Sequence, residues 1–116
     1  MATLTVGSID LDKVEVALTA AAGGGDEFAN TEREIFFVKN AGSGAITLTF
    51  TGQRASNFGV TSNKALSITN DSKIYAIGPF LKDWFNDAND RVQVTYSGVT
   101  TVTVGALKLL DPVSAL

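Results

Sequence analysis

Short runs of alternating apolar and polar residues, separated by turn-forming residues, constrain the fold of this chain more than any other feature. The clearest run is Ile46–Thr51, in which apolar residues alternate with threonine, and Val92–Ser97 alternates in the same way. Successive strand side chains point to opposite faces, so each run predicts a strand with one buried face. About seven to eight short strands and almost no helix predict an all-β protein, an antiparallel β-sandwich or jelly roll.

The N-terminal part of the chain is less regular. Residues 1–12 are predicted to be a flexible arm or an edge strand, ahead of a single sandwich domain over residues 13–116. Valine and leucine alternate with other residues over 13–19, which predicts the first strand of that domain. The Ala- and Gly-rich stretch 20–25 is predicted to be a mobile loop, because glycine leaves the backbone few restraints.

Two further patterns predict how strands are connected. Ile35–Val38 is a continuous apolar run, typical of a strand covered on both faces, and Asn40–Gly44 has the composition of a turn. We therefore expect this strand to form a hairpin with the strand over 46–50. Near the C-terminus the apolar phase changes at Gly105, which predicts a bulge or a strand that crosses between two sheets.

The stretch Ile77–Ser97 is predicted to form a corner of the fold. Proline cannot donate a ladder hydrogen bond, so Gly78-Pro79 ends the preceding strand. Leu81, Trp84 and Phe85 follow at the i, i+3, i+4 spacing of one helical face, which predicts a single helical turn near 81–86 that plugs one end of the core.

Three residues are candidates for a protein interface: Phe58, Trp84 and Arg54. Trp84 has two interpretations, core closure together with Phe80 and Phe85, or an exposed anchor, because Trp and Arg are over-represented at the energetic centres of interfaces. Phe58 lies in the long polar segment between Gly52 and Lys64 and either staples that loop or contacts a partner. Arg33, Arg54 and Arg91 are rim contacts or ordinary surface charge.

Composition excludes several functional classes. The chain has 116 residues, a net charge of −3, and neither Cys nor His. Disulfides and cysteine nucleophiles are excluded, and the commonest general base and metal ligand are missing. We therefore expect no enzyme activity and no cofactor. The scattered charges and the lack of a long apolar segment argue against nucleic acid and membrane partners, so we expect a soluble protein made in a cytoplasm.

Sequence motifs for ligand binding are weak. Asp87–Arg91 begins like a calcium-binding EF-hand loop, but Arg91 stands at a ligand position and Val92 replaces the required glycine. A weaker oxygen-ligand site that uses Asp26, Asp87 or Asp90 stays open beside the simpler interpretation of a solvated turn. The Asn70–Ser72 glycosylation triplet is interpreted as a turn.

Several blocks of the chain resemble a group of small proteins encoded among the structural genes of tailed bacteriophages. The resemblance covers about residues 24–110, and its blocks are 25–30, 33–40, 46–49, 77–80, 85–87 and 92–97. The combination of Ile-Gly-Pro-Phe with Val-Thr-Tyr-Ser is the most distinctive part.

The resemblance implies a non-enzymatic virion protein. Its best-supported form is a capsid decoration (cement) protein that binds the lattice of the major capsid protein on the virion surface, often as a homotrimer. It brings no catalytic, metal or binding residues to positions of this chain. The alternatives are a head-completion, tail or fibre-associated protein, and a carbohydrate- or host-binding sandwich module.

Overall fold

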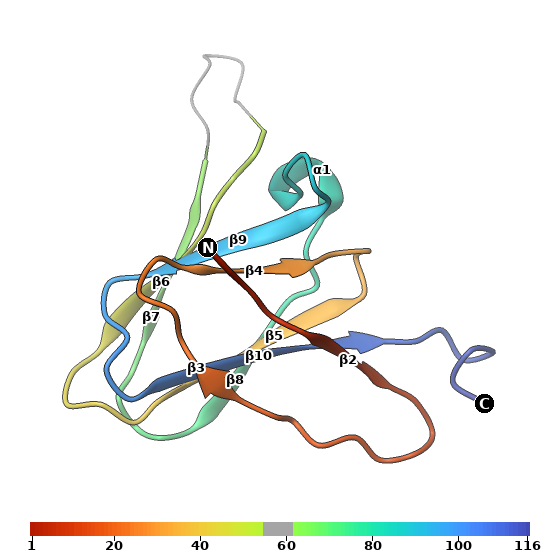
Figure 1. Ribbon diagram of the computed structural model, residues 1–116, viewed down its shortest axis with the longest axis horizontal. Coiled ribbons are helices and arrows are strands. Elements are labelled where there is room, and N and C mark those ends of the chain that lie inside the picture. Colours follow the sequence, from red (N-terminus) through yellow and green to blue (C-terminus); the bar gives the residue numbers. More distant parts are fainter. Residues whose placement is uncertain (55–61) are drawn as a thin grey trace.

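The chain forms a sandwich of two sheets with one short helix (Figure 1). The computed structural model describes residues 1–54 and 62–116. Within them lie β1 (Ala2–Thr3), β2 (Val6–Ile9), β3 (Thr19–Ala20), β4 (Asp26–Ala29), β5 (Glu34–Asn40), β6 (Ile46–Phe50), β7 (Lys64–Ile68), β8 (Ile74–Ile77), α1 (Lys82–Phe85), β9 (Arg91–Tyr96) and β10 (Val102–Leu109). The predicted all-β sandwich with one helical turn is confirmed. No helix in the described residues is long and apolar enough to cross a membrane.

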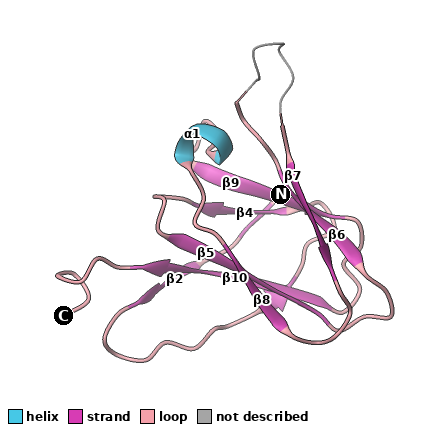
Figure 2. Ribbon diagram, turned by 180° about the vertical axis from the view of Figure 1, so that it is seen from behind, coloured by secondary structure: helices cyan, strands magenta, loops and turns pink. Residues whose placement is uncertain are grey.

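The two sheets are mixed and not purely antiparallel. One sheet has the order β1-β4-β9-β6-β7, and the other has the order β2-β10-β5-β8, with β3 also paired to β10. The parallel pairs are β1 with β4 and β2 with β10, and both involve the N-terminal residues. Figure 2 shows the two layers from behind, with the N-terminal residues passing from one sheet to the other.

The core is centred on four phenylalanine rings that come from both sheets. Phe28 of β4 and Phe50 of β6 face Phe36 of β5, with ring centroids 5.7 Å apart for Phe28–Phe36 and 5.4 Å for Phe36–Phe50. Phe80, which follows β8, closes the cluster at 4.7 Å from Phe50 and 5.5 Å from Phe28. Full burial of each ring stabilises the fold by about 1.5–3 kcal/mol, so this cluster is a main source of cohesion between the layers.

The predicted hairpin between the strands at 35–38 and 46–50 is wrong, because β5 and β6 belong to different sheets. Asn40 supports the crossing: its side-chain amide donates to the carbonyl oxygens of Gly44 (2.9 Å) and Ile68 (3.2 Å), and its Oδ1 accepts from the N–H of Gly42. Alternation predicts which face is buried but does not choose the neighbouring strand. β5 is also covered unequally, since buried and half-buried residues alternate along it.

The predicted strand over 13–19 is also wrong. Only Thr19–Ala20 pairs, with Thr103 and Val104 of β10, while Val14 and Val16 are exposed. Residues 10–18 instead form a strap along the edge of the molecule (Figure 1). The following glycine-rich stretch is a turn in which the N–H of Gly25 donates to the carbonyl of Ala22 over 2.9 Å.

The phase change at Gly105 has a different cause from the one predicted. β10 pairs with β5 in unbroken register from Val102↔Asn40 to Lys108↔Glu34, so there is no bulge and no crossing. The strap approaches so closely that a Cβ at position 105 would lie 2.5 Å from the carbonyl oxygen of Ala17. Leu107 points the same way as Gly105 and is buried beside Gly7, so the N-terminal residues cover this outer face.

The approach of the strap to β10 predicts that Gly105→Ala is destabilising. We expect a loss of about 1–3 kcal/mol in the free energy of unfolding, because the methyl group forces the Ala17 backbone away. Gly44→Ala is the matched control, since a Cβ there meets nothing within 4 Å. Urea unfolding of both variants measures the difference, and equal stabilities would contradict the close approach.

Candidate protein interface

The corner after β8 places one aromatic ring inside the core and one outside it. A cis Gly78–Pro79 peptide ends the strand, and Gly78 has φ 137°, a conformation that favours glycine. A Cβ on Gly78 would also lie 2.9 Å from the carbonyl oxygen of Glu34. Phe80 then enters the core with only 4% of its surface exposed, and α1 follows immediately.

The helical turn does not plug the core in the way predicted. Leu81 is 50% exposed and Trp84 is 37% exposed, while Phe85 is half-buried against Phe80 with ring centroids 5.8 Å apart. Of the three aromatic residues in the core-closure interpretation, Phe80 is buried and Phe85 packs against it, whereas Trp84 is exposed. No residue of the four-residue α1 is fully buried.

Arg54 and Trp84 are brought together although they are far apart in the sequence. The guanidinium carbon of Arg54 lies 5.2 Å from the centre of the Trp84 ring system, a cation–π contact, and the neighbouring Gln53 N–H donates to the carbonyl oxygen of Trp84 over 2.7 Å. We call Arg54, Leu81 and Trp84 the Trp84 corner. Phe58, the third candidate interface residue, lies outside the described residues.

Two asparagines hold the base of the Trp84 corner. The buried Asn30 side-chain amide donates to the carbonyl oxygen of Phe80 (3.0 Å) and to Oδ1 of Asn86 (2.7 Å), and the Asn86 amide donates back to the carbonyl of Asn30 (3.0 Å). Both ends of α1 are therefore tied to the end of β4. Sequence reasoning missed these residues because Asn is common in turns, and nothing in the local pattern shows what an asparagine side chain binds.

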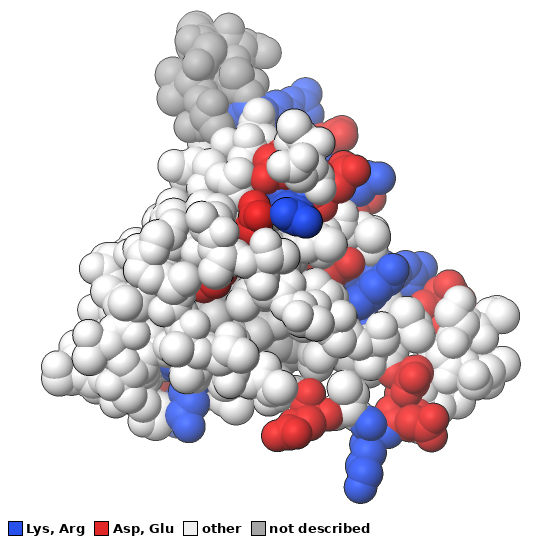
Figure 3. All heavy atoms as spheres, viewed as in Figure 1, with Lys and Arg blue, Asp and Glu red and all other residues white. Residues whose placement is uncertain are grey.

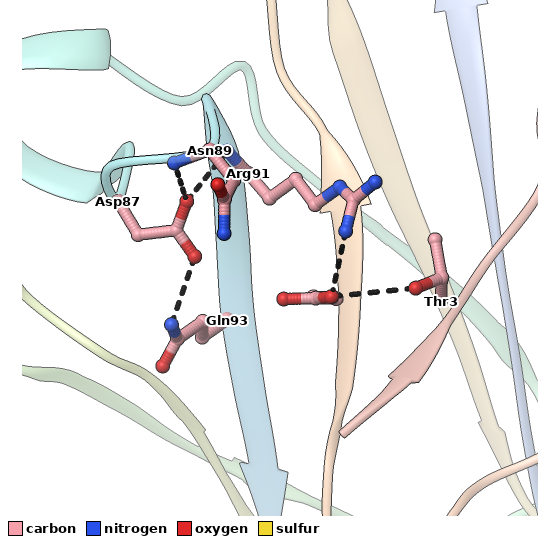
Figure 4. Close-up of polar contacts among 6 residues, drawn as sticks. Thr3, Asp87, Asn89, Arg91 and Gln93 are labelled. Carbon is pink, nitrogen blue, oxygen red and sulfur yellow. Dashed lines mark hydrogen bonds and ion pairs between the residues drawn. The ribbon is translucent and has the colours of Figure 1, made fainter.

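Asp87 was considered for a cation site, but its carboxylate accepts hydrogen bonds from the protein itself. Asp87 accepts hydrogen bonds from the N–H groups of Asn89 (2.8 Å) and Arg91 (3.1 Å) and from the side chain of Gln93 (2.8 Å), as Figure 4 shows. Burial opposes ionisation of Asp87, but these donors outweigh it and hold its pKa below the usual value. Arg91 forms an ion pair with Glu27 at 2.9 Å.

Asp26 is buried and also has its own donors. Its Oδ2 accepts from the Tyr96 hydroxyl (2.7 Å) and from the N–H of Ala22 (3.1 Å). Asp90 stands in the left-handed region with φ 57° at the turn before β9. Over residues 1–54 and 62–116 no three acidic side chains gather closely enough to hold a metal ion. Asp87 and Asp90 share one turn, in which the Asp90 N–H donates to the Asp87 carbonyl oxygen over 3.1 Å, but they form no group of three acidic side chains with Asp26.

A second surface feature is a group of three uncharged segments at one end of the sandwich, beside the turn that carries Asp71 and Lys73. The segments 20–24, 41–45 and 97–101 contain no Lys, Arg, Asp or Glu. Hydrogen bonds from the N–H of Ala41 to Thr101 and from Ala21 to Val102 bring them together. They lie at the left of Figure 1, and Figure 3 shows that this part of the face is mostly uncharged, while charges gather toward the other edges. We call these three segments the uncharged end.

Comparisons of the chain with models of protein families, with curated proteins and with solved structures found no match.

The buried Tyr96–Asp26 hydrogen bond predicts a loss of stability at alkaline pH. Burial, with the hydrogen bond to Asp26 and its charge, raises the pKa of Tyr96 in the folded state. The unfolded chain then loses this proton above about pH 10 while the folded chain keeps it, so stability falls as pH rises through that range. We expect Tyr96→Phe to be less stable at neutral pH and to lack this part of the alkaline fall.

Tyr75→Phe is the comparison for this prediction, because the hydrogen bond to Asp71 also raises the pKa of Tyr75, but at an exposed position where solvent screening makes the expected effect on stability smaller. Unfolding by urea at pH 8, 10 and 11 separates the two tyrosines. If the free energy of unfolding depends on pH in the same way in the wild type and in Tyr96→Phe, the alkaline loss of stability does not come from Tyr96.

Proposed function

We propose that this protein is a non-enzymatic structural protein of a tailed-phage virion, a capsid decoration protein that binds the lattice of the major capsid protein and stabilises the head. The resemblance of residues 24–110 to proteins of that kind supports the class. The observation that carries a docking role is the Trp84 corner, where an indole and a guanidinium from distant parts of the chain meet at an exposed and braced position.

The chemistry of the Trp84 corner favours protein recognition. Trp and Arg are the residue types most enriched where alanine substitution weakens binding strongly. The hydrogen bonds of Asn30 and Asn86 hold the turn that carries Trp84, so little conformational freedom is lost when a partner binds. Leu81, which starts the same turn, adds exposed apolar surface.

The shape of the molecule is compatible with a coat on a larger particle. Its extents are 43 × 39 × 20 Å, so a broad and thin body presents a large face to a flat support. One copy needs to bind only moderately, because contacts repeated over many linked sites add through effective concentration.

The uncharged end supports the homo-oligomer, and a trimer is the form we propose. The cores of protein interfaces are depleted of charged residues, and this end has none over three adjoining segments. If copies contact one another through the uncharged end, the Trp84 corner stays accessible to the major capsid protein.

The proposal is tested by adding the purified protein to mature capsids that lack it and counting bound copies per shell by sedimentation. Saturable binding of many copies, with a shell that resists heating better, is the expected result. Binding of only a few copies per particle would favour the head-completion, tail or fibre alternative. No binding to capsids, together with binding to a glycan, would overturn the proposal in favour of a host-attachment module.

Trp84→Ala is predicted to weaken capsid binding by about 30-fold or more, which corresponds to a loss of about 2 kcal/mol at an interface centre. Ile74→Ala is the matched control, because Ile74 is a large apolar residue that is 52% exposed on β8 and lies outside the Trp84 corner. Equal binding by both variants, measured as copies bound against free concentration, would remove the Trp84 corner from the interface.

A further inference from the structure

The first nine residues, which we call the N-terminal arm, form the last strand of both sheets on the same side of the sandwich. Ala2–Thr3 pairs with β4, and Val6–Ile9 pairs with β10. The N–H groups of Ala2 and Leu4 donate to the carbonyls of Gly25 (3.0 Å) and Glu27 (2.8 Å). Because β1 and β2 are both edge strands, withdrawing the N-terminal arm breaks no pairing among the other strands.

The N-terminal arm lies between the edges of β4 and β10, and we call this position the β4–β10 seam. Leu4 and Val6 pack against the buried core, so an empty seam would expose apolar surface and two strand edges. A cavity of about 350 Å³ lies beside the arm, between Thr3–Thr5, the strap at Val14–Thr19 and β10. The arm and the strap are thus separate segments, each resting on β10.

The segment that joins the N-terminal arm to the rest of the chain contacts β10 at Ala17 but is otherwise exposed. All of residues 10–17 are exposed, and the segment has no strand pairing before Thr19. Its backbone hydrogen bonds include Leu11 N–H to Ala115 and Ala17 N–H to Glu15. Residues 10–18, when extended, span up to roughly 30 Å. The arm can therefore leave its own seam and enter that of a copy whose seam lies within this distance.

We propose that the N-terminal arm is exchanged between copies of this chain, so that the arm of one subunit occupies the β4–β10 seam of its neighbour. Every hydrogen bond and apolar contact of the arm is then made between subunits in place of within one, so the contacts themselves favour neither arrangement. Exchange of an identical element is a low-cost route to oligomers. The two sides of the contact differ, because the arm of one subunit enters the seam of the next. Three such contacts can therefore close a ring of three subunits.

This inference deepens the homo-oligomer part of the proposed function, and its test uses the free protein, so it can fail while capsid binding succeeds. Because the chain has no cysteine, a pair introduced at Ser8 and Lys108, which are register partners on β2 and β10, forms the only disulfide that this variant can make. Adjacent strands lie about 4.8 Å apart, within the span of a disulfide. The full-length S8C/K108C variant is refolded at high protein concentration, oxidised and run on a non-reducing gel.

The expected product of S8C/K108C is a covalent oligomer. The control is T103C/K39C, a register pair between β10 and β5, neither of which belongs to the arm, and it should give only intrachain disulfide and run as a monomer. T3C/E27C repeats the test at the β1–β4 pairing, so that a folding defect in one variant does not decide the result. Intrachain products from both arm pairs, or a wild-type chain that sediments as a monomer at high concentration, would overturn the exchange.

Discussion

The contact of four phenylalanine rings across the two sheets is the interaction on which the other features depend. Phe28 and Phe50 come from one sheet and Phe36 comes from the other, so these rings join the two layers at the centre of the buried core. Phe80 completes the cluster from a loop and lies against both Phe50 and Phe28. The position of α1 is therefore set by the core, and the exposed Trp84 takes its orientation from a buried neighbour.

Buried polar side chains hold the connections at the ends of the strands by hydrogen bonds. Asn30 ties α1 to β4, Asn40 supports the crossing between the sheets, and Glu34 accepts hydrogen bonds from the N–H groups of Thr31 (2.8 Å) and Arg33 (3.0 Å) at the start of β5. In the described part of the chain every buried side-chain nitrogen or oxygen has a hydrogen-bond partner. A buried polar group without a hydrogen-bond partner lowers the stability of the fold. These side chains therefore disfavour any connection of the strands that would leave them unpaired.

The three surface features complement one another in the proposed role. The Trp84 corner suits recognition of a different protein, whereas the uncharged end and the edge strands of the N-terminal arm suit contacts between identical copies. All three lie at an end or an edge of the sandwich, because the interior is filled by side chains of β4, β5, β6, β9 and β10. Function in a protein of this kind is expected at the rim of the layers.

Alternation in runs such as Ile46–Thr51 and Val92–Ser97 was enough to predict strands, a sandwich and the buried faces, because a period of two is a local property of a pleated chain. The partners of those strands were not predictable in the same way. The separation of β5 from β6, the exposure of Trp84 next to the buried Phe80, and the meeting of Arg54 with Trp84 all depend on which surfaces remain available once the sheets pack. A local pattern carries no information about that competition, which only the tertiary structure resolves.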